Sequence, residues 1–168
     1  WTLCHPNCFP QLPHQIDSKK LLERYVVVYF YYSTNGPSWQ GDQYNVMSTT
    51  SDVCEWNADT SNQQGVYCNS DGIIDRIIFG PDYSMDGTIP RALGLLTHLT
   101  ELDMYDLGLT GSIPFEIGLL TELEGLSLRE NQLTGTIPTE IGLLTELEWL
   151  TLDYNQLTGS IPSEIGLL

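Results

Sequence analysis

From Gly87 onward, hydrophobic and polar positions recur with a period of 24 residues. Copies of this unit begin at Gly87, Gly111, Gly135 and Gly159, and the last copy is followed to Leu168. The full units keep the spacing L-x-x-L-x-L, as at Leu123, Leu126 and Leu128, with Met104 in the third position of the first unit. A fixed period in the twenties predicts a solenoid of stacked coils rather than a globular core.

Each coil is predicted to contain one short strand. Leu126 and Leu128 alternate with polar positions, so both side chains point to one face of the strand. The inward set is completed by Leu123, Leu133, Ile137 and Ile141. One coil cannot bury its apolar face alone, so neighbouring coils must stack and share both strand hydrogen bonds and a continuous interior.

Two further columns mark the bends between strands. Asn131 and Asn155 occupy equivalent positions, where a buried amide can satisfy turn backbone in its own coil and the next. The first unit has Leu107 at this position, so the asparagine ladder begins late. A proline follows each G-[TS]-I segment and fixes the bend there, at Pro90, Pro114, Pro138 and Pro162.

The combined pattern L-x-x-L-x-L-x-x-N-x-L-T-G-x-I-P-x-x-I-G-x-L resembles the plant-type leucine-rich repeat. The near-identical IGLLTEL segments look most like those of microalgae, diatoms in particular. The resemblance implies an α/β solenoid: a right-handed leucine-rich repeat superhelix with a parallel concave β-sheet and a second short sheet from L-T-G-x-I-P. We expect a tail and cap over residues 1–72 and repeats over 73–168. The repeats comprise an irregular first coil, three full units from Gly87 and a partial fourth.

The cap is predicted to begin with a helix over 17–32, with Asp17 or Ser18 as the N-cap. The apolar positions on one helical face are Leu21, Leu22, Tyr25, Val28, Tyr29 and Tyr32. The β-branched and aromatic run 26–30 favours a strand by propensity alone. We prefer the helix because Gly36 and Pro37 follow as a sharp stop. The run is also too short to span a bilayer, so no direct membrane insertion is expected.

The segments S-T-N-G-P-S-W and C-E-W…G-V-Y-C, between residues 33 and 68, resemble the N-terminal cap of plant-type and algal leucine-rich repeat proteins. That resemblance implies a disulfide between Cys54 and Cys68, despite an insertion over 57–64. A loop of this size is worth about 3 kcal/mol in the chain-entropy model. Paired cysteines predict an oxidising compartment, so we expect an extracellular, secreted or cell-surface protein.

The remaining cysteines, Cys4 and Cys8, lie in the N-terminal tail. They pair with each other or tie the tail down; the alternative is a metal site with His5 and His14. The C-x3-C spacing is not a standard zinc spacing, so the prediction is a disulfide and no metal. The chain opens with Trp1 rather than methionine, as expected of a mature or trimmed product.

Charge restricts the partners. Six basic residues stand against 22 acidic ones, for a formal net charge of −16. Nucleic acid is excluded as a natural partner because phosphate neutralisation needs lysine and arginine. Anionic membranes are disfavoured for the same reason. A basic protein, a cation-rich matrix or a mineral surface is electrostatically compatible.

The outward strand positions form columns that vary between units while IGLLTEL barely changes. The resemblance implies that ligand contacts lie on this concave face. The predicted contact residues are Arg76, Glu101, Asp103, Tyr105, Arg129, Trp149, Asp153 and Tyr154. Tryptophan, tyrosine and arginine are the residue types that anchor interfaces. The alternative is that these are ordinary exposed residues.

Metal binding and catalysis have weaker support in the sequence. Glu122 stacks over Glu146, and Glu124 over Glu148, at a coil spacing of about 4.8 Å. Bound calcium would relieve their repulsion, and so would splayed, solvated side chains. Catalysis has little support, because His98 is the only histidine in the repeats and no converging carboxylate pair or phosphate-binding loop appears.

The sequence therefore predicts a non-catalytic extracellular recognition module without a cofactor, which binds a protein or a glycan through the concave face. The alternative is a structural subunit of an extracellular, cell-wall or membrane-complex assembly. Solenoids need a polar cap at both ends, and the fourth unit leaves its inward leucines open at Leu168. Either the repeats continue beyond this residue, or another subunit covers the open coil through self-association or in a larger complex.

Overall fold

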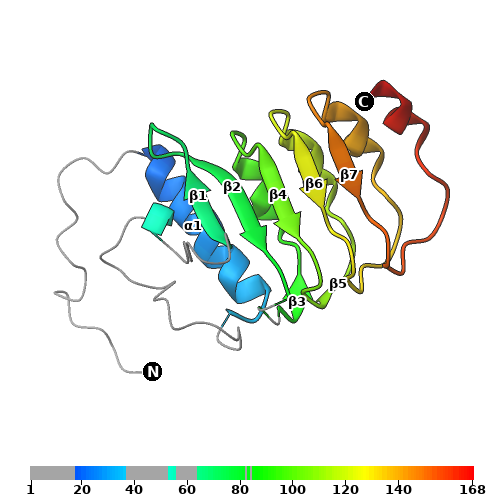
Figure 1. The fold of residues 1–168 in the computed structure, drawn as a ribbon, viewed down its shortest axis with the longest axis horizontal. Coiled ribbons are helices and arrows are strands. Elements are labelled where there is room, and N and C mark those ends of the chain that lie inside the picture. The colour runs from blue at the N-terminus through cyan, green and yellow to red at the C-terminus, as the bar shows by residue number, and fades with distance from the viewer. Residues whose placement is uncertain (1–17, 37–52, 56–63, 82, 84) are drawn as a thin grey trace, which may run out of the picture.

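The computed structural model describes residues 18–36, 53–55, 64–81, 83 and 85–168. Their elements stack along one axis as successive coils (Figure 1). A main sheet forms one side of the stack, and a helix followed by a row of short 3-10 turns forms the other. The solenoid predicted from the 24-residue period is therefore confirmed.

The described strands form two sheets. The main sheet has the order β1 (Gly65–Cys68), β2 (Ile74–Phe79), β4 (Glu101–Met104), β6 (Gly125–Ser127) and β7 (Trp149–Thr151). β1 runs antiparallel to β2, and every later neighbour is parallel. The second sheet pairs β3 (Gly87–Thr88) with β5 (Leu109–Thr110), as expected of the L-T-G-x-I-P segment.

The helical side begins with α1 (Ser18–Ser33) and η2 (Val53–Glu55). The 3-10 turns that follow, one in each coil, are η3 (Arg91–Leu95), η4 (Phe115–Leu119), η5 (Thr139–Leu143) and η6 (Ser163–Leu167). None of the helices in the described ranges has the length and hydropathy needed to cross a membrane.

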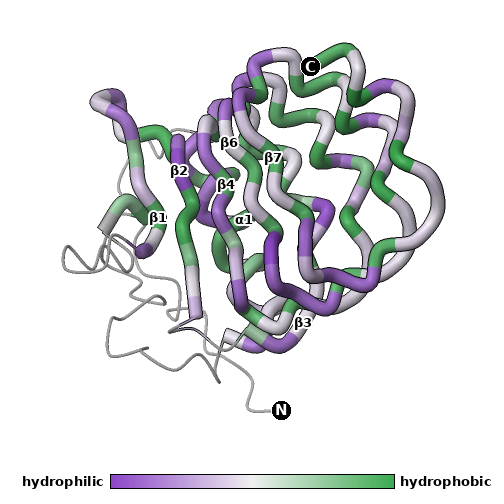
Figure 2. The backbone as a smooth tube through the Cα atoms, turned by 45° about the vertical axis from the view of Figure 1, so that its right-hand side comes forward, coloured by the Kyte–Doolittle hydropathy of each residue, from purple (hydrophilic) through white to green (hydrophobic). Residues whose placement is uncertain are grey.

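The interior is a continuous ladder of aliphatic side chains between the two sides. Leu123, Leu126, Leu128 and Leu133 are all fully buried, as the spacing predicts, while Ile137 is half-buried. Hydrophobic positions consequently recur at the same level in successive coils (Figure 2). At the N-terminal end, the ring of Phe30 from α1 lies 6.0 Å from the ring of Phe79 and closes this interior.

The repeated glycine of IGLL has a packing reason. Gly118 is buried in η4, and the backbone carbonyl of Glu140 from the next coil lies against its Cα. A Cβ at this position would collide with the carbonyl and with the Glu140 side chain. The glycine therefore sets how closely consecutive 3-10 turns can approach.

Asn131 joins two coils through its side chain. Its Oδ1 accepts the backbone N–H groups of Leu107 and Leu109, at 3.2 and 3.0 Å. Its Nδ2 donates to the carbonyls of Met104 and Leu128, at 2.7 and 3.1 Å. Asn155 repeats three of these four bonds one coil later, with Leu133 N–H as the donor to its Oδ1, but it is half-buried. The predicted ladder is thus present, and it satisfies backbone groups that the bends leave unpaired.

The helix prediction was right in type and wrong in orientation. α1 exposes the face that carries Leu21, Tyr25, Tyr29 and Tyr32, which the sequence pattern grouped as one apolar face. The side facing the interior carries Glu23, Val26, Val27, Phe30 and Tyr31. α1 is apolar on two sides, so periodicity could not select the face that packs. Burial raises the pKa of Glu23, although the Ile74 backbone N–H and nearby cations oppose the shift.

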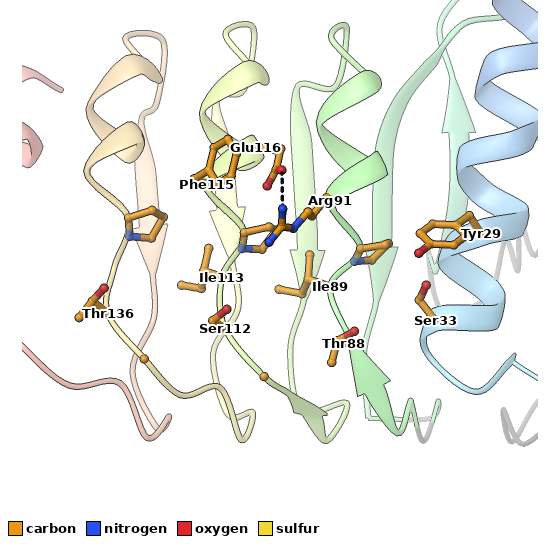
Figure 3. Close-up of a pocket in the computed structure, with 15 residues that line it drawn as sticks. Tyr29, Ser33, Thr88, Ile89, Arg91, Ser112, Ile113, Phe115, Glu116 and Thr136 are labelled. Atoms are coloured by element: carbon orange, nitrogen blue, oxygen red, sulfur yellow. Dashed lines mark ion pairs between the residues drawn. The ribbon is translucent and has the colours of Figure 1, made fainter.

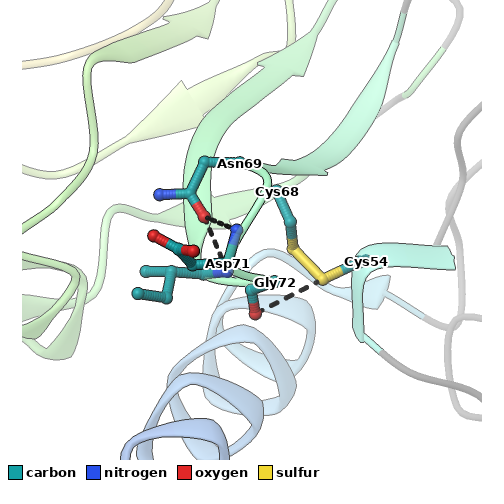
Figure 4. Close-up of a disulfide and its surroundings, with 6 residues drawn as sticks. Cys54, Cys68, Asn69, Asp71 and Gly72 are labelled. Carbon is teal, nitrogen blue, oxygen red and sulfur yellow. Dashed lines mark hydrogen bonds between the residues drawn. A yellow bond between two sulfur atoms is a disulfide. The ribbon is translucent and has the colours of Figure 1, made fainter.

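The cap carries the expected disulfide between Cys54 and Cys68 (Figure 4). It links η2 to the end of β1, next to a tight turn in which Asn69 Oδ1 accepts the N–H groups of Asp71 and Ile73. Cys4 and Cys8, with the alternative metal ligands His5 and His14, lie outside the described residues. The boundary at residue 72 stays a prediction; structurally, β1 joins the sheet of the repeats.

The asparagine ladder predicts a graded loss of stability. Asn131→Ala leaves the N–H groups of Leu107 and Leu109 and the Met104 carbonyl without their partner in a buried bend, so the free energy of unfolding should fall by about 2 to 4 kcal/mol. Asn155→Ala is the matched control and should cost about 1 kcal/mol, because water can reach its half-buried partners. Urea unfolding of both variants checks this order, and equal losses would contradict it.

Candidate functional site

The outward face of the main sheet brings the predicted contact residues onto neighbouring coils. Backbone pairing joins Arg76 to Glu101, Glu101 to Gly125 and Gly125 to Trp149. Asp103 pairs with Ser127 in the next column. The columns predicted from the sequence are therefore present in these strands, and the outward residues share one surface.

Trp149 lies back across the preceding coil. The atoms nearest to a Cβ built on Gly125 belong to its indole ring, and they would overlap such a Cβ. Only a glycine at this position therefore lets the ring rest on β6, where Trp149 remains 39% exposed. Tyr105 does the same at the other end of the sheet, since a Cβ on Gly80 would lie 2.8 Å from Tyr105 Cε1. Two aromatic rings thus rest on the sheet and stay accessible to a ligand.

A charged cluster follows the ends of the later strands. Arg129 Nε lies 3.0 Å from Asp153 Oδ2, and its Nη2 lies 2.8 Å from Glu130 Oε1. The same guanidinium lies over the ring of Tyr154, at 5.5 Å from the centroid. Exposed ion pairs of this kind contribute about 1 kcal/mol or less to stability. They orient the guanidinium that lies over the ring of Tyr154, which is 73% exposed.

Arg76 does not join this cluster. Its guanidinium lies over the ring of Tyr67 from β1, at 4.6 Å from the centroid, at the opposite end of the sheet. The structure therefore brings Arg129, Asp153 and Tyr154 together and keeps Arg76 apart from them. The sequence placed Arg76 in the correct column of the sheet but did not indicate its contact with Tyr67 of the cap.

Asp103 is the chemically unusual residue of the surface. Its Oδ1 is buried and has no hydrogen-bond partner in the described part of the chain. Burial raises the pKa of Asp103, while a hydrogen bond with the Ser127 side chain opposes the shift. A carboxylate that is partly desolvated and incompletely paired favours a ligand that brings a cation or a hydrogen-bond donor.

The sequence analysis missed a second concave feature, a groove of about 710 Å³ on the other side of the coils. It runs between the row of 3-10 turns and β3, with the main sheet behind (Figure 3). Thr88, Ser112 and Thr136 occupy one column along it, and Tyr29 of α1 stands at one end. The repeated G-[TS]-I-P segment is the available signal; it predicts a bend and a second short sheet but does not by itself indicate a groove beside them.

The acidic columns do not form a metal centre in the described ranges. No group of three or more histidine, cysteine, aspartate or glutamate side chains there could hold a metal ion. Glu122 Oε2 instead lies 3.1 Å from His98 Nδ1 on the surface. This contact gives one of the stacked glutamates a protein partner on the surface.

Comparisons with known proteins agree with the repeat pattern. The Leucine Rich Repeat family model matches residues 122–144 and 146–168. A comparison with curated protein sequences gives no significant match.

Solved structures of plant receptors resemble the chain. The PEPR1–AtPEP1 complex has a TM-score of 0.65 and 24% identity, over 90% of this chain and 20% of that one. The Arabidopsis thaliana GASSHO1/SCHENGEN3 ectodomain, in complex with CASPARIAN STRIP INTEGRITY FACTOR 2, has a TM-score of 0.64 and 28% identity. That match covers 89% of this chain and 17% of the ectodomain chain. The plant peptide hormone receptor RGFR1, in complex with RGF2, has a TM-score of 0.58 and 36% identity. That match covers 63% of this chain and 20% of the RGFR1 chain.

These matches confirm the leucine-rich repeat solenoid fold with its capped N-terminal end. The chain spans about a fifth of the length of the PEPR1 chain, so the activity of the whole receptor does not follow from the likeness. The narrower resemblance to microalgal repeats stays a prediction.

The raised pKa of Asp103 predicts a pH-dependent gain from Asp103→Asn. A raised carboxyl pKa in the folded state means that the ionised form opposes folding above that pKa. The asparagine variant should therefore be more stable than the wild type near about pH 7, and its advantage should shrink toward about pH 4 as Asp103 takes up a proton.

Urea unfolding at several pH values measures this difference. Glu148→Gln, at an exposed position beside Trp149, is the control for removing one negative charge. If both variants gain equally, the effect comes from net charge, and the local explanation is wrong.

Proposed function

We propose that this chain is a non-catalytic recognition module, which binds a protein ligand through the outward face of its main sheet. The observation that carries the proposal is the pair of aromatic rings, Trp149 and Tyr105, each accommodated by a glycine in the preceding coil. Large rings that are held in place and remain accessible supply contact area at low entropic cost.

The charge of the surface indicates the character of the ligand. Glu101 and Asp103 lie between the two aromatic positions in the sheet, and Arg129 is already paired with Asp153 and Glu130. Between the two rings a ligand therefore meets unmatched carboxylates, while Arg76, the other cation of this face, lies over the Tyr67 ring at the cap end of the sheet. The net charge of −16 adds a long-range attraction for positive partners. The ligand that fits is a basic segment of a protein, with apolar side chains for the rings.

Two further observations support the proposal. The PEPR1 and RGFR1 structures are complexes with AtPEP1 and RGF2, and RGFR1 is a peptide hormone receptor. The Cys54–Cys68 disulfide favours an oxidising compartment, so we place the module outside the cell. We propose a protein rather than a glycan on this face because a basic peptide would neutralise its carboxylates, whereas a neutral glycan would not. The alternative role, a structural subunit of a larger assembly, is also a proposal. Measurement of the oligomeric state distinguishes it from ligand recognition.

Peptide selection tests the proposal. The disulfide-bonded protein is exposed to displayed peptides of matched length that are basic, neutral or acidic, and basic sequences with aromatic or aliphatic residues should be enriched. Trp149→Ala and Tyr105→Ala should each weaken the selected peptides by about tenfold or more, equivalent to about 1.4 kcal/mol.

Phe115→Ala, a half-exposed aromatic in the groove on the other side, is the matched control and should leave peptide affinity unchanged. If the selected peptides bind Trp149→Ala as tightly as the wild type, the proposal that they bind the concave face is wrong. Loss of an oligomer in Trp149→Ala, with no peptide binding by the wild type, would favour the structural role instead.

A further inference from the structure

We propose that the groove along the second sheet binds a neutral glycan chain laid across successive coils. This site is separate from the concave face and goes beyond the recognition function proposed above. The groove is crossed by equivalent residues from consecutive coils, so it offers the same groups repeatedly in one direction (Figure 3). A polymer of equivalent units matches such a surface better than a compact molecule.

The hydroxyl groups along the second sheet fall into two classes. Those of Thr110 and Thr134 are occupied, since they donate to the carbonyls of Gly87 and Gly111 at 3.0 and 3.2 Å. Those of Thr88, Ser112 and Thr136 are exposed and make no hydrogen bond to any described residue. The groove therefore presents one open hydroxyl in each coil, and each hydroxyl can both donate and accept.

Glu116 adds an unsatisfied acceptor to the wall of the groove. Its side chain is only 16% exposed, and its Oε1 lies 3.7 Å from Arg91 Nη1, which is long for an ion pair. Its Oε2 is buried without a hydrogen-bond partner in the described ranges. An unpaired buried acceptor is costly, so a rotation of the Glu116 carboxylate that brings this oxygen to an O–H group of a ligand would be favoured. The exposed guanidinium of Arg91 can donate to ligand oxygens beside it.

The rest of the groove is apolar. Ile89 and Ile113 are buried beneath it, and the proline column contributes ring surfaces without N–H groups. Tyr29 and Phe115 stand half-exposed along it, and Arg91 lies over the Phe115 ring at 5.7 Å from the centroid. A mostly apolar floor with a few convergent polar groups is typical of ligand sites. Sugar rings suit it, because they carry C–H faces and hydroxyl edges on the same unit.

Charge disfavours an anionic polymer in this groove, and spacing disfavours an extended peptide. Arg91 is the single cation among the residues that line the groove, in a chain of net charge −16, so a polyanion would be repelled. An extended peptide places same-side groups about 6.6 Å apart, whereas coils recur about every 4.8 Å. A peptide would therefore lose register with the open hydroxyls within a few coils.

Calorimetry with defined oligosaccharides tests the proposal. The probes are the neutral cellohexaose, laminarihexaose and mannohexaose, with hexagalacturonate as the anionic comparison. At least one neutral hexasaccharide should bind the wild type. Phe115→Ala should weaken it by about tenfold or more. Glu116→Gln, which keeps the side-chain shape, should weaken it by a smaller factor because the amide is a poorer acceptor than a carboxylate.

Trp149→Ala is the control, because it alters the concave face and leaves the groove intact; it should bind the oligosaccharide as the wild type does. Loss of peptide binding in Trp149→Ala with glycan binding retained separates this inference from the proposed function. The inference is overturned if no neutral hexasaccharide binds at millimolar concentration, if hexagalacturonate binds better, or if Phe115→Ala has no effect.

Discussion

Each coil of this molecule depends on backbone hydrogen bonds to its neighbour, because no coil encloses a core of its own. The pairing that advances by 24 residues from β4 to β6 and from β6 to β7 is the constraint from which the other features follow. Beyond the strands, the N–H of Glu148 donates to Glu124 at 2.7 Å, and the N–H of Gln132 donates to Leu109 at 2.8 Å. Equivalent positions of successive units therefore stack in register along the described coils.

This register produces two surfaces with different properties from the same repeat. On the main sheet the outward positions vary from coil to coil, and the result is one composite surface of Trp149, Tyr105 and charged groups. On the side of the second sheet the G-[TS]-I-P segment is nearly invariant, and the result is a row of equivalent hydroxyls and prolines. The first suits a ligand with a specific sequence, and the second suits a ligand that repeats. The two proposed sites therefore rest on one physical cause.

Small residues decide how closely the coils can approach and where the large ones lie. Gly118 allows the next 3-10 turn to pack against its own turn, which keeps the outer side of the stack compact. Gly125 allows the Trp149 indole to rest on β6 instead of extending away from the sheet. In both places the absence of a Cβ in one coil determines the position of a group from the next.

The sequence by itself determined the solenoid, the strand positions, the asparagine ladder and the columns of the concave face, because each follows from a period that repeats along the chain. The Cys54–Cys68 pairing came from resemblance and is present. Only the tertiary structure decided which face of α1 packs, because that helix is apolar on two sides and the choice depends on what it meets. The same holds for the ring positions of Trp149 and Tyr105, the isolation of Arg76 and the unpaired Glu116 oxygen. These depend on contacts between coils, whose geometry a one-dimensional pattern does not contain.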